Sequence, residues 1–142
     1  MIRFAVIVLV VAAAAIGGWF SRRRASDAPT QASSQTPTQL DRADFAQPDV
    51  EWLVVVFTSA SCNACADMAT KAKVLESRQV AIQIIEYTQD RDLHKRYAID
   101  SVPCLLMADA GGVVRQSYLG PVTATDLWAG LARVREGYSR EN

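Results

Sequence analysis

The feature that most constrains the fold is a continuous apolar segment, residues 52–57, that ends shortly before a pair of cysteines. Its side chains are Trp, Leu, Val and Phe, with no polar position between them. Such a run predicts a strand buried on both faces, as in the centre of a parallel sheet. Cys62 follows across a short polar turn, and residues 64–78 have apolar side chains at helical spacing. The sequence therefore predicts a strand, a turn and a helix, with Cys62 and Cys65 where the helix begins.

The segments that follow alternate between strand and helix patterns. Three of them, rich in apolar and β-branched residues, predict strands: residues 80–87, 104–108 and 113–119. Residues 109–112 predict a tight turn that joins the last two strands into a hairpin. Residues 90–97 predict a short charged helix, and residues 40–45 a helical turn. This order predicts an α/β fold, a sandwich built around one β-α-β unit.

A last helix is expected near the C-terminus. Thr123 or Thr125 is suited to cap its first turn. Its apolar side is expected to consist of Leu127, Trp128, Leu131 and Val134.

The N-terminus predicts a membrane anchor. Residues 4–20 are uncharged and apolar, and as a helix they would span about 26 Å, near the thickness of a bilayer core. Trp19 and Phe20 lie where aromatic residues favour the interface, and three arginines follow at 22–24. A buried core helix would not be apolar on all faces. A cleaved signal peptide is the stronger alternative, but it is disfavoured by the arginines directly after the run.

Four regions follow from these patterns: an anchor with a basic flank (1–24), a flexible Ser/Thr/Pro/Gln linker (25–39), a folded domain (40–137) and a short tail (138–142). The chain is expected to cross the cell membrane once. The arginines favour a domain on the cytoplasmic face, whereas the linker composition favours an extracytoplasmic one. The side of the membrane stays open.

Composition excludes some functions. The chain has 142 residues, with 15 basic and 15 acidic side chains, so its formal net charge is zero. Because the chain has no excess of basic residues, we expect no nucleic-acid partner. Its length allows one domain of ordinary size. The chain has three cysteines, an odd number, whereas small secreted domains held by disulfides have an even number. The cysteines are therefore expected to carry chemistry.

The motif Cys62-Asn63-Ala64-Cys65 is the main candidate for a reactive site. Residues three apart on the first turn of a helix lie on one face, at a separation that a disulfide can bridge. Because Cys62 lies at the helix N-terminus, where unpaired N–H groups favour an anion, we expect the pKa of its thiol to be lowered. Cys65 lies one turn further and is expected to be more shielded. Cys62 is thus the expected attacking thiol, and Cys65 the resolving thiol.

The same residues admit other interpretations. A zinc site would combine Cys62, Cys65, Cys104 and His94, although His94 is expected to be a solvated residue of its helix. The pair is otherwise a structural disulfide or two idle thiols. Cys104 is interpreted either as a small apolar residue in a strand or as a third thiol close to the dithiol. In the second case it would exchange with the dithiol, or join it around a soft metal or an iron–sulfur cluster.

Pro103 directly precedes a predicted strand, where proline marks either a cis turn or an ordinary trans bond. The apolar strand, the CxxC motif at a helix start, Val102-Pro103 before a strand, and a hairpin followed by Gly120 together resemble the thioredoxin family over residues 40–135. The resemblance implies a thioredoxin-like fold, a central mixed sheet flanked by helices, here preceded by one transmembrane helix. It also implies that Pro103 is cis and packs against the dithiol, so that Val102 and Pro103 present backbone to substrates.

The resemblance implies an enzyme, a thiol–disulfide oxidoreductase that acts through a mixed disulfide and needs no cofactor beyond its dithiol. Protein thiols and disulfides are the implied clients. The anchor and linker are similar to those of membrane-tethered thioredoxin-like proteins of bacteria. This similarity implies a redox partner in the membrane. The alternatives are a metal or iron–sulfur protein that uses Cys62, Cys65 and Cys104, and a scaffold with little turnover. The direction of electron flow (reductase, oxidase or isomerase) stays open.

Several positions depart from the family pattern. Asn63-Ala64 stands where the family has Gly-Pro, and Ser61 where it has Trp. A buried Asp and its Lys partner are replaced by Val56 and by Ile84 or a neighbour in residues 82–85. The joint loss is physically consistent, because one member of a buried charged pair left alone is costly. It also removes the usual internal base. This loss predicts a protein that acts on a narrower set of clients or has a different redox poise.

Overall fold

A mixed sheet of four strands, in the order β2-β1-β3-β4, forms the centre of the structure. The computed structural model describes residues 36–141, and the predicted anchor, residues 1–24, lies outside the described residues. The strands are β1 (Trp52–Thr58), β2 (Val80–Glu86), β3 (Cys104–Ala108) and β4 (Val114–Leu119). β1 is parallel to β2 and antiparallel to β3, which is antiparallel to β4. All four predicted strands are confirmed, and every residue of β1 is buried, as its apolar sequence indicated.

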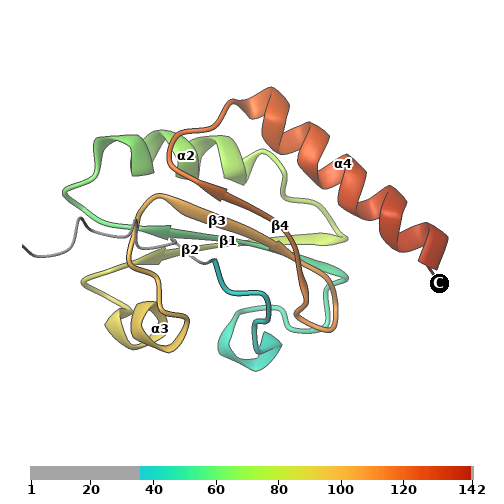
Figure 1. Cartoon of the computed structure of the whole chain (residues 1–142), viewed down its shortest axis with the longest axis horizontal. Coiled ribbons are helices and arrows are strands. Elements are labelled where there is room, and N and C mark those ends of the chain that lie inside the picture. The colour runs from blue at the N-terminus through green and yellow to red at the C-terminus, as the bar shows by residue number, and fades with distance from the viewer. Residues whose placement is uncertain (1–35, 142) are drawn as a thin grey trace, which may run out of the picture. The chain divides into compact units, whose positions relative to one another are not determined.

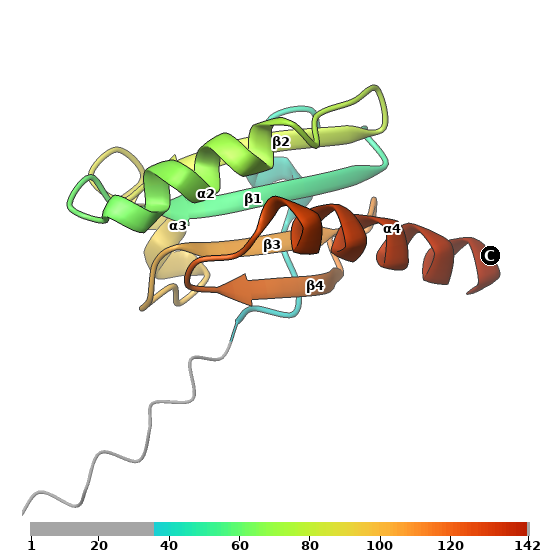
Figure 2. The ribbon, with the colours of Figure 1, turned by 90° about the horizontal axis from the view of Figure 1, so that it is seen from above.

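Helices cover both faces of this sheet. α2 (Asn63–Lys73) and α4 (Ala124–Glu141) lie over one face, and α3 (Arg91–Arg96) and the short 3-10 helix η1 (Arg42–Asp44) lie at the other (Figure 1). From above, α2 runs along β1 and β2, and α4 packs against α2 and β4 (Figure 2). The predicted α/β fold, a central mixed sheet flanked by helices, is confirmed. In the described range, none of the helices is long and apolar enough to span a membrane.

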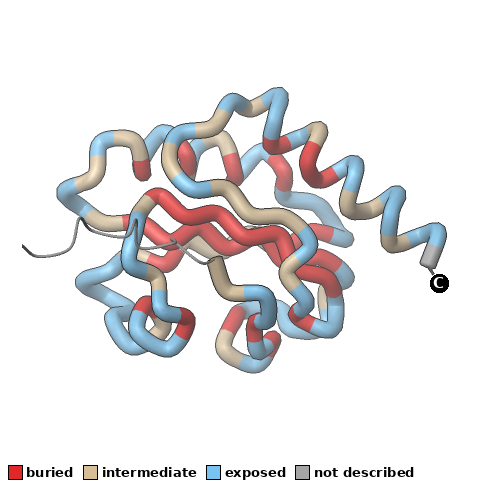
Figure 3. The backbone as a smooth tube through the Cα atoms, in the orientation of Figure 1, coloured by how far each residue is buried: buried red, intermediate tan, exposed pale blue. Residues whose placement is uncertain are grey.

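Alternation along the strands divides the core into two clusters, because successive strand residues point to opposite faces. The α2-side cluster includes Val54, Val56, Met68, Leu105 and Leu127. The α3-side cluster includes Val55, Phe57, Ile85, Cys104 and Leu106. The two central strands, β1 and β3, in which every residue is buried, therefore form the buried centre of the domain (Figure 3). Each fully buried aliphatic side chain stabilises such a core by about 1.5–3 kcal/mol.

The helix that begins at the cysteines is shorter than predicted. α2 ends at Lys73 rather than at residue 78. Ser77 and Val80 exchange two backbone hydrogen bonds of 3.1 and 3.2 Å, which turn the chain into β2. Leu75 stays 2% exposed although it lies beyond the helix, so its apolar character reflected burial rather than helical structure.

The C-terminal helix confirms one predicted cap and corrects one core residue. The Thr123 hydroxyl accepts from the backbone N–H of Asp126 at 3.1 Å, so Thr123 rather than Thr125 caps α4. Leu127 and Leu131 are buried, but Trp128 is 53% exposed, so it does not belong to the apolar side predicted for this helix.

The folded domain begins before residue 40 and continues beyond residue 137. Thr38 accepts a backbone hydrogen bond from Val114 at 2.9 Å, and Leu40 donates one to Gly112 at 2.8 Å. The predicted linker, residues 25–39, therefore overlaps the domain at 36–39. Gly112 has a φ of +78°, and a Cβ there would lie 2.0 Å from the Leu40 carbonyl oxygen, so this close approach requires glycine.

Candidate active site

Cys62 and Cys65 form a disulfide at the start of α2. Their Cα atoms are 5.3 Å apart. Cys62 is the N-cap residue of the helix, and its carbonyl accepts from the N–H of Cys65 at 3.1 Å. The predicted pairing of these residues on the first helical turn is confirmed.

The two cysteines differ in exposure. Cys65 faces the core and is only 2% exposed, whereas Cys62 is partly exposed. Because attack on an external disulfide needs an accessible sulfur, only Cys62 can meet a large substrate without rearrangement of the helix. The predicted shielding of Cys65 is confirmed.

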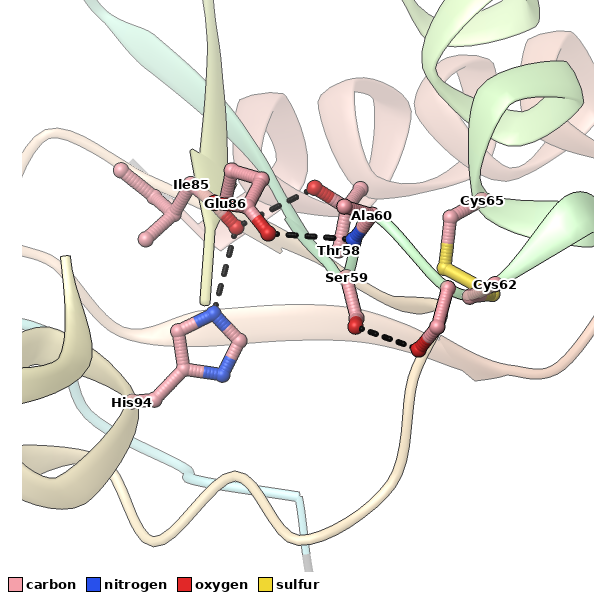
Figure 4. The surroundings of a disulfide bond; sticks show 9 residues. Thr58, Ser59, Ala60, Cys62, Cys65, Ile85, Glu86 and His94 are labelled. Carbon is pink, nitrogen blue, oxygen red and sulfur yellow. Dashed lines mark hydrogen bonds between the residues drawn. A yellow bond between two sulfur atoms is a disulfide. The ribbon is translucent and has the colours of Figure 1, made fainter. Parts of the chain in front are cut away.

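The loop between β1 and α2 is tied to the end of β2 (Figure 4). The Thr58 hydroxyl donates to the Ile85 carbonyl at 3.4 Å, and the Ala60 N–H donates to the Glu86 carboxylate at 3.0 Å. The N–H of Cys62 donates to the Ser59 carbonyl at 3.0 Å, which closes a turn directly before the helix. These contacts fix the path of the backbone that leads into the disulfide.

Glu86 is the residue at this site that sequence reasoning missed. Its carboxylate accepts hydrogen bonds from Ala60, Thr88 and Gln89. The hydrogen bond from the Thr88 hydroxyl is the largest cause of a lowered pKa of the Glu86 carboxyl, with further contributions from the backbone N–H groups. A single acidic residue at a strand end carries no motif, so the only available signal was its place at the end of the strand beside β1.

The Val102–Pro103 peptide bond is cis, as the family resemblance implied. Cys104, the next residue, is the register partner of Phe57 on β1. Since β3 is antiparallel to β1, the start of β3 lies beside the end of β1, where the loop to Cys62 begins. The Pro103 carbonyl also accepts from the N–H of Gly120 at 2.9 Å, which brings the end of β4 to the same edge.

Cys104 is a buried free cysteine, 1% exposed. Its side chain belongs to the α3-side cluster, on the face of the sheet opposite α2. Burial, with a smaller contribution from the charge of Asp100, raises the pKa of the Cys104 thiol to about 12. The position favours the interpretation of Cys104 as an apolar strand residue. Among the side chains that the structure describes, no group of three His, Cys, Asp or Glu residues could hold a metal.

His94 was expected to be solvated, and this prediction is wrong. The residue is 2% exposed, and its Nε2 lies 3.2 Å from the Ile85 carbonyl oxygen. Its ring packs edge-on against Phe57 at 5.0 Å and Tyr87 at 5.2 Å between centroids. The charged residues of α3 suggested an exposed helix, so the sequence did not indicate that His94 is buried.

Val56, where the family resemblance implies a buried acid, is the register partner of Ile84, one of the positions expected to replace its lysine. Val56 is fully buried and Ile84 partly buried, both in the α2-side cluster. These two positions therefore place no carboxylate or amine on the face of the sheet that α2 covers.

A disulfide at the N-terminus of the helix that follows β1, with a cis-proline directly before the neighbouring strand β3 of a mixed sheet, defines a thioredoxin-like thiol–disulfide oxidoreductase. The family model for thioredoxin matches residues 38–133, which is more than half of the chain. The chain belongs to the thioredoxin family.

Solved structures agree on the fold. Fasciola hepatica thioredoxin is 20% identical, with a TM-score of 0.52 over 61% of this chain and 83% of that one. A mutant thioredoxin from Halobacterium salinarum is 18% identical, with a TM-score of 0.50 over 56% and 71%. A structure described as a malarial protein is 15% identical, with a TM-score of 0.53 over 58% and 96%. No curated protein sequence matches the chain.

Proposed function

We propose that Cys62 is the nucleophile and Cys65 the resolving thiol of this oxidoreductase. In the reducing direction, the Cys62 thiolate attacks one sulfur of a client disulfide; a mixed disulfide forms and one client thiolate leaves. Cys65, deprotonated, then attacks the Cys62 sulfur and releases the second client thiolate. Two electrons pass to the client, two protons restore its thiols, and the chain is left with the Cys62–Cys65 disulfide. The oxidising direction is the reverse. The observation that carries the proposal is the disulfide between a partly exposed N-cap cysteine and a buried one.

The client is a protein thiol or disulfide that binds across residues 102–103. Val102 is partly exposed, and Pro103 lies at the start of β3, beside the end of β1 from which the Cys62 loop departs. An extended client segment would bond to backbone there while its sulfur meets Cys62. The dithiol is itself the redox group, so the exchange requires no organic cofactor.

The apolar pair of Val56 and Ile84 bears on the second step. Deprotonation of Cys65 has no help from a carboxylate at position 56, so resolution of the mixed disulfide is expected to be slow at neutral pH. Slow resolution favours a restricted set of clients that stay bound long enough for Cys65 to react.

Trapping tests these roles in the full-length protein. Cys65→Ser is expected to accumulate a mixed disulfide between Cys62 and a protein client that contains a disulfide, whereas Cys62→Ser is expected to form none. Cys104→Ser, the matched control, is expected to keep insulin-reducing activity. An adduct on Cys65 in the Cys62→Ser variant, or full activity without Cys62, would overturn the assignment.

We also propose that residues 4–20 anchor the chain in the cell membrane as a single span, with a membrane redox partner that renews the dithiol. The support is the uncharged apolar run and its arginine flank. Labelling of intact cells with a membrane-impermeant maleimide tests it. Labelling of Cys62 places the domain outside the cytoplasm, and a need for prior reduction shows an oxidised resting state. Labelling only after lysis places the domain on the cytoplasmic face, and recovery in the soluble fraction refutes the anchor.

A further inference from the structure

Glu86 lies outside the dithiol and the cis-proline segment, yet it contacts the loop that carries Cys62. It is the last residue of β2 and the register partner of Thr58, the last residue of β1. Because these strands are parallel, both end at the same edge of the sheet, where the loop to α2 begins. The Glu86 side chain there reaches the backbone of Ala60, two residues before Cys62 (Figure 4).

Both oxygens of the Glu86 carboxylate accept hydrogen bonds. Oε1 accepts from the Ala60 N–H at 3.0 Å. Oε2 accepts from the N–H groups of Thr88 at 2.8 Å and Gln89 at 3.2 Å, and from the Thr88 hydroxyl. Hydrogen bonds to an ionised carboxylate are shorter and stronger than those between neutral groups. The side chain thus joins the loop before Cys62 to the turn that follows β2.

The other contacts between these segments lie one step further from the sulfur. The N–H of Tyr87 donates to the Thr58 carbonyl at 2.9 Å, and the Thr58 hydroxyl donates to Ile85. Both act at the end of β1. The Glu86 bond acts in the middle of the loop, so it restrains the segment between the sheet and the helix.

We propose that Glu86 is a positioning residue whose carboxylate, through Ala60, sets where Cys62 lies relative to Val102 and Pro103. The inference rests on the proposed function, since a protein client must meet Cys62 and the backbone of residues 102–103 together. A misplacement of about 1 Å can cost about 100-fold in rate. Thr58 and α2 still hold the two ends of the loop, so we expect a smaller loss. A small disulfide needs only the sulfur and is indifferent to this alignment.

Two variants of the full-length protein remove the bond between the side chain and Ala60. Glu86→Ala removes both acceptor oxygens. Glu86→Gln keeps the side-chain length but has a single acceptor oxygen, which the donors of Thr88 and Gln89 attract, so that its NH2 group faces the Ala60 N–H and cannot accept from it. The readout is the rate constant with insulin divided by that with a small disulfide, in which changes of the thiolate population cancel. Both variants are expected to lower this ratio, Glu86→Ala about tenfold and Glu86→Gln by a similar factor, because each loses the bond to Ala60. Thr88→Val, the matched control, loses one donor to Oε2, keeps the Ala60 bond and should keep the ratio.

Amide hydrogen exchange at Ala60 tests the bond without catalysis. Exchange is expected to be at least about fivefold faster in Glu86→Ala and in Glu86→Gln than in the wild type, and close to wild type in Thr88→Val. If the wild-type protein neither reduces nor oxidises any protein substrate through Cys62, the proposed function fails, and Ala60 exchange still tests whether Glu86 restrains the loop. Unchanged Ala60 exchange, or insulin and small-disulfide rates that fall by the same factor, would overturn the positioning role.

Discussion

Replacing Val56 by aspartate puts a carboxyl group where the sheet excludes water. Val56 is 0% exposed and lies between Ile84 on β2 and Leu105 on β3. Leaving an unpaired charge in such a site costs about 3–5 kcal/mol of unfolding free energy. Val56→Asn has nearly the same shape without the charge, and it measures the loss of packing and the burial of a polar group.

The pH dependence isolates the charge. Burial raises the pKa of the introduced carboxyl above its unfolded value of about 3.9. The folded state then binds more protons than the unfolded state, so the penalty is absent below about pH 4 and grows as pH rises, by about 1.4 kcal/mol per unit until the folded pKa is reached. Val56→Asn should show no such slope.

Ile84→Lys supplies the missing partner. The Val56→Asp/Ile84→Lys double variant should be more stable at pH 7 than the sum of the single changes predicts, by about 1–3 kcal/mol. Urea unfolding of the oxidised full-length protein from pH 4 to 8, followed by fluorescence of the buried Trp52, measures all four variants. If Val56→Asp and Val56→Asn have equal stability at every pH, the carboxyl reaches water and the reasoning about a dry site is wrong.

Two further predictions concern Cys104 and the cap of α4. Burial raises the pKa of the Cys104 thiol from 9.0 to about 12. The contribution of this thiol to the free energy of unfolding is therefore complete below pH 9 and is lost as pH rises toward 12. Urea unfolding from pH 8 to 11 should show that this free energy declines more steeply in the wild type than in Cys104→Ala. The native oxidised protein should also take up no maleimide at pH 8, and rapid labelling there would contradict the buried position. Thr123→Ala should destabilise the protein by about 1 kcal/mol and Thr125→Ala by much less, as measured by thermal unfolding; equal losses would refute the capping assignment.

The sequence predicted the strands and the dithiol because their signals are local. The apolar run at 52–57 can be satisfied only where both faces of a strand are covered, and β1 lies between β2 and β3 with all its residues buried. Cys62 and Cys65 need only the first turn of one helix to meet, so their spacing was sufficient to predict the disulfide.

Other features depend on neighbours that are distant in the sequence. His94 lies on a charged helix, and only its packing against Phe57 and Tyr87 makes it a core residue. Cys104 follows the cis-proline, but the pleat of β3 turns its side chain toward the α3-side cluster. A pattern of residue types does not report which of the two faces of a strand meets which helix.

The chain by itself thus determined the class of fold, the reactive dithiol and the loss of the buried charged pair, since each follows from residue type and short-range spacing. The tertiary structure alone decided that Glu86 reaches Ala60, that Thr58 bonds to Ile85, and that the proline segment lies at the edge where the Cys62 loop begins. These contacts exist because parallel and antiparallel strands bring their ends to one edge of the sheet, and that pairing is set by burial over the whole domain rather than by any local sequence.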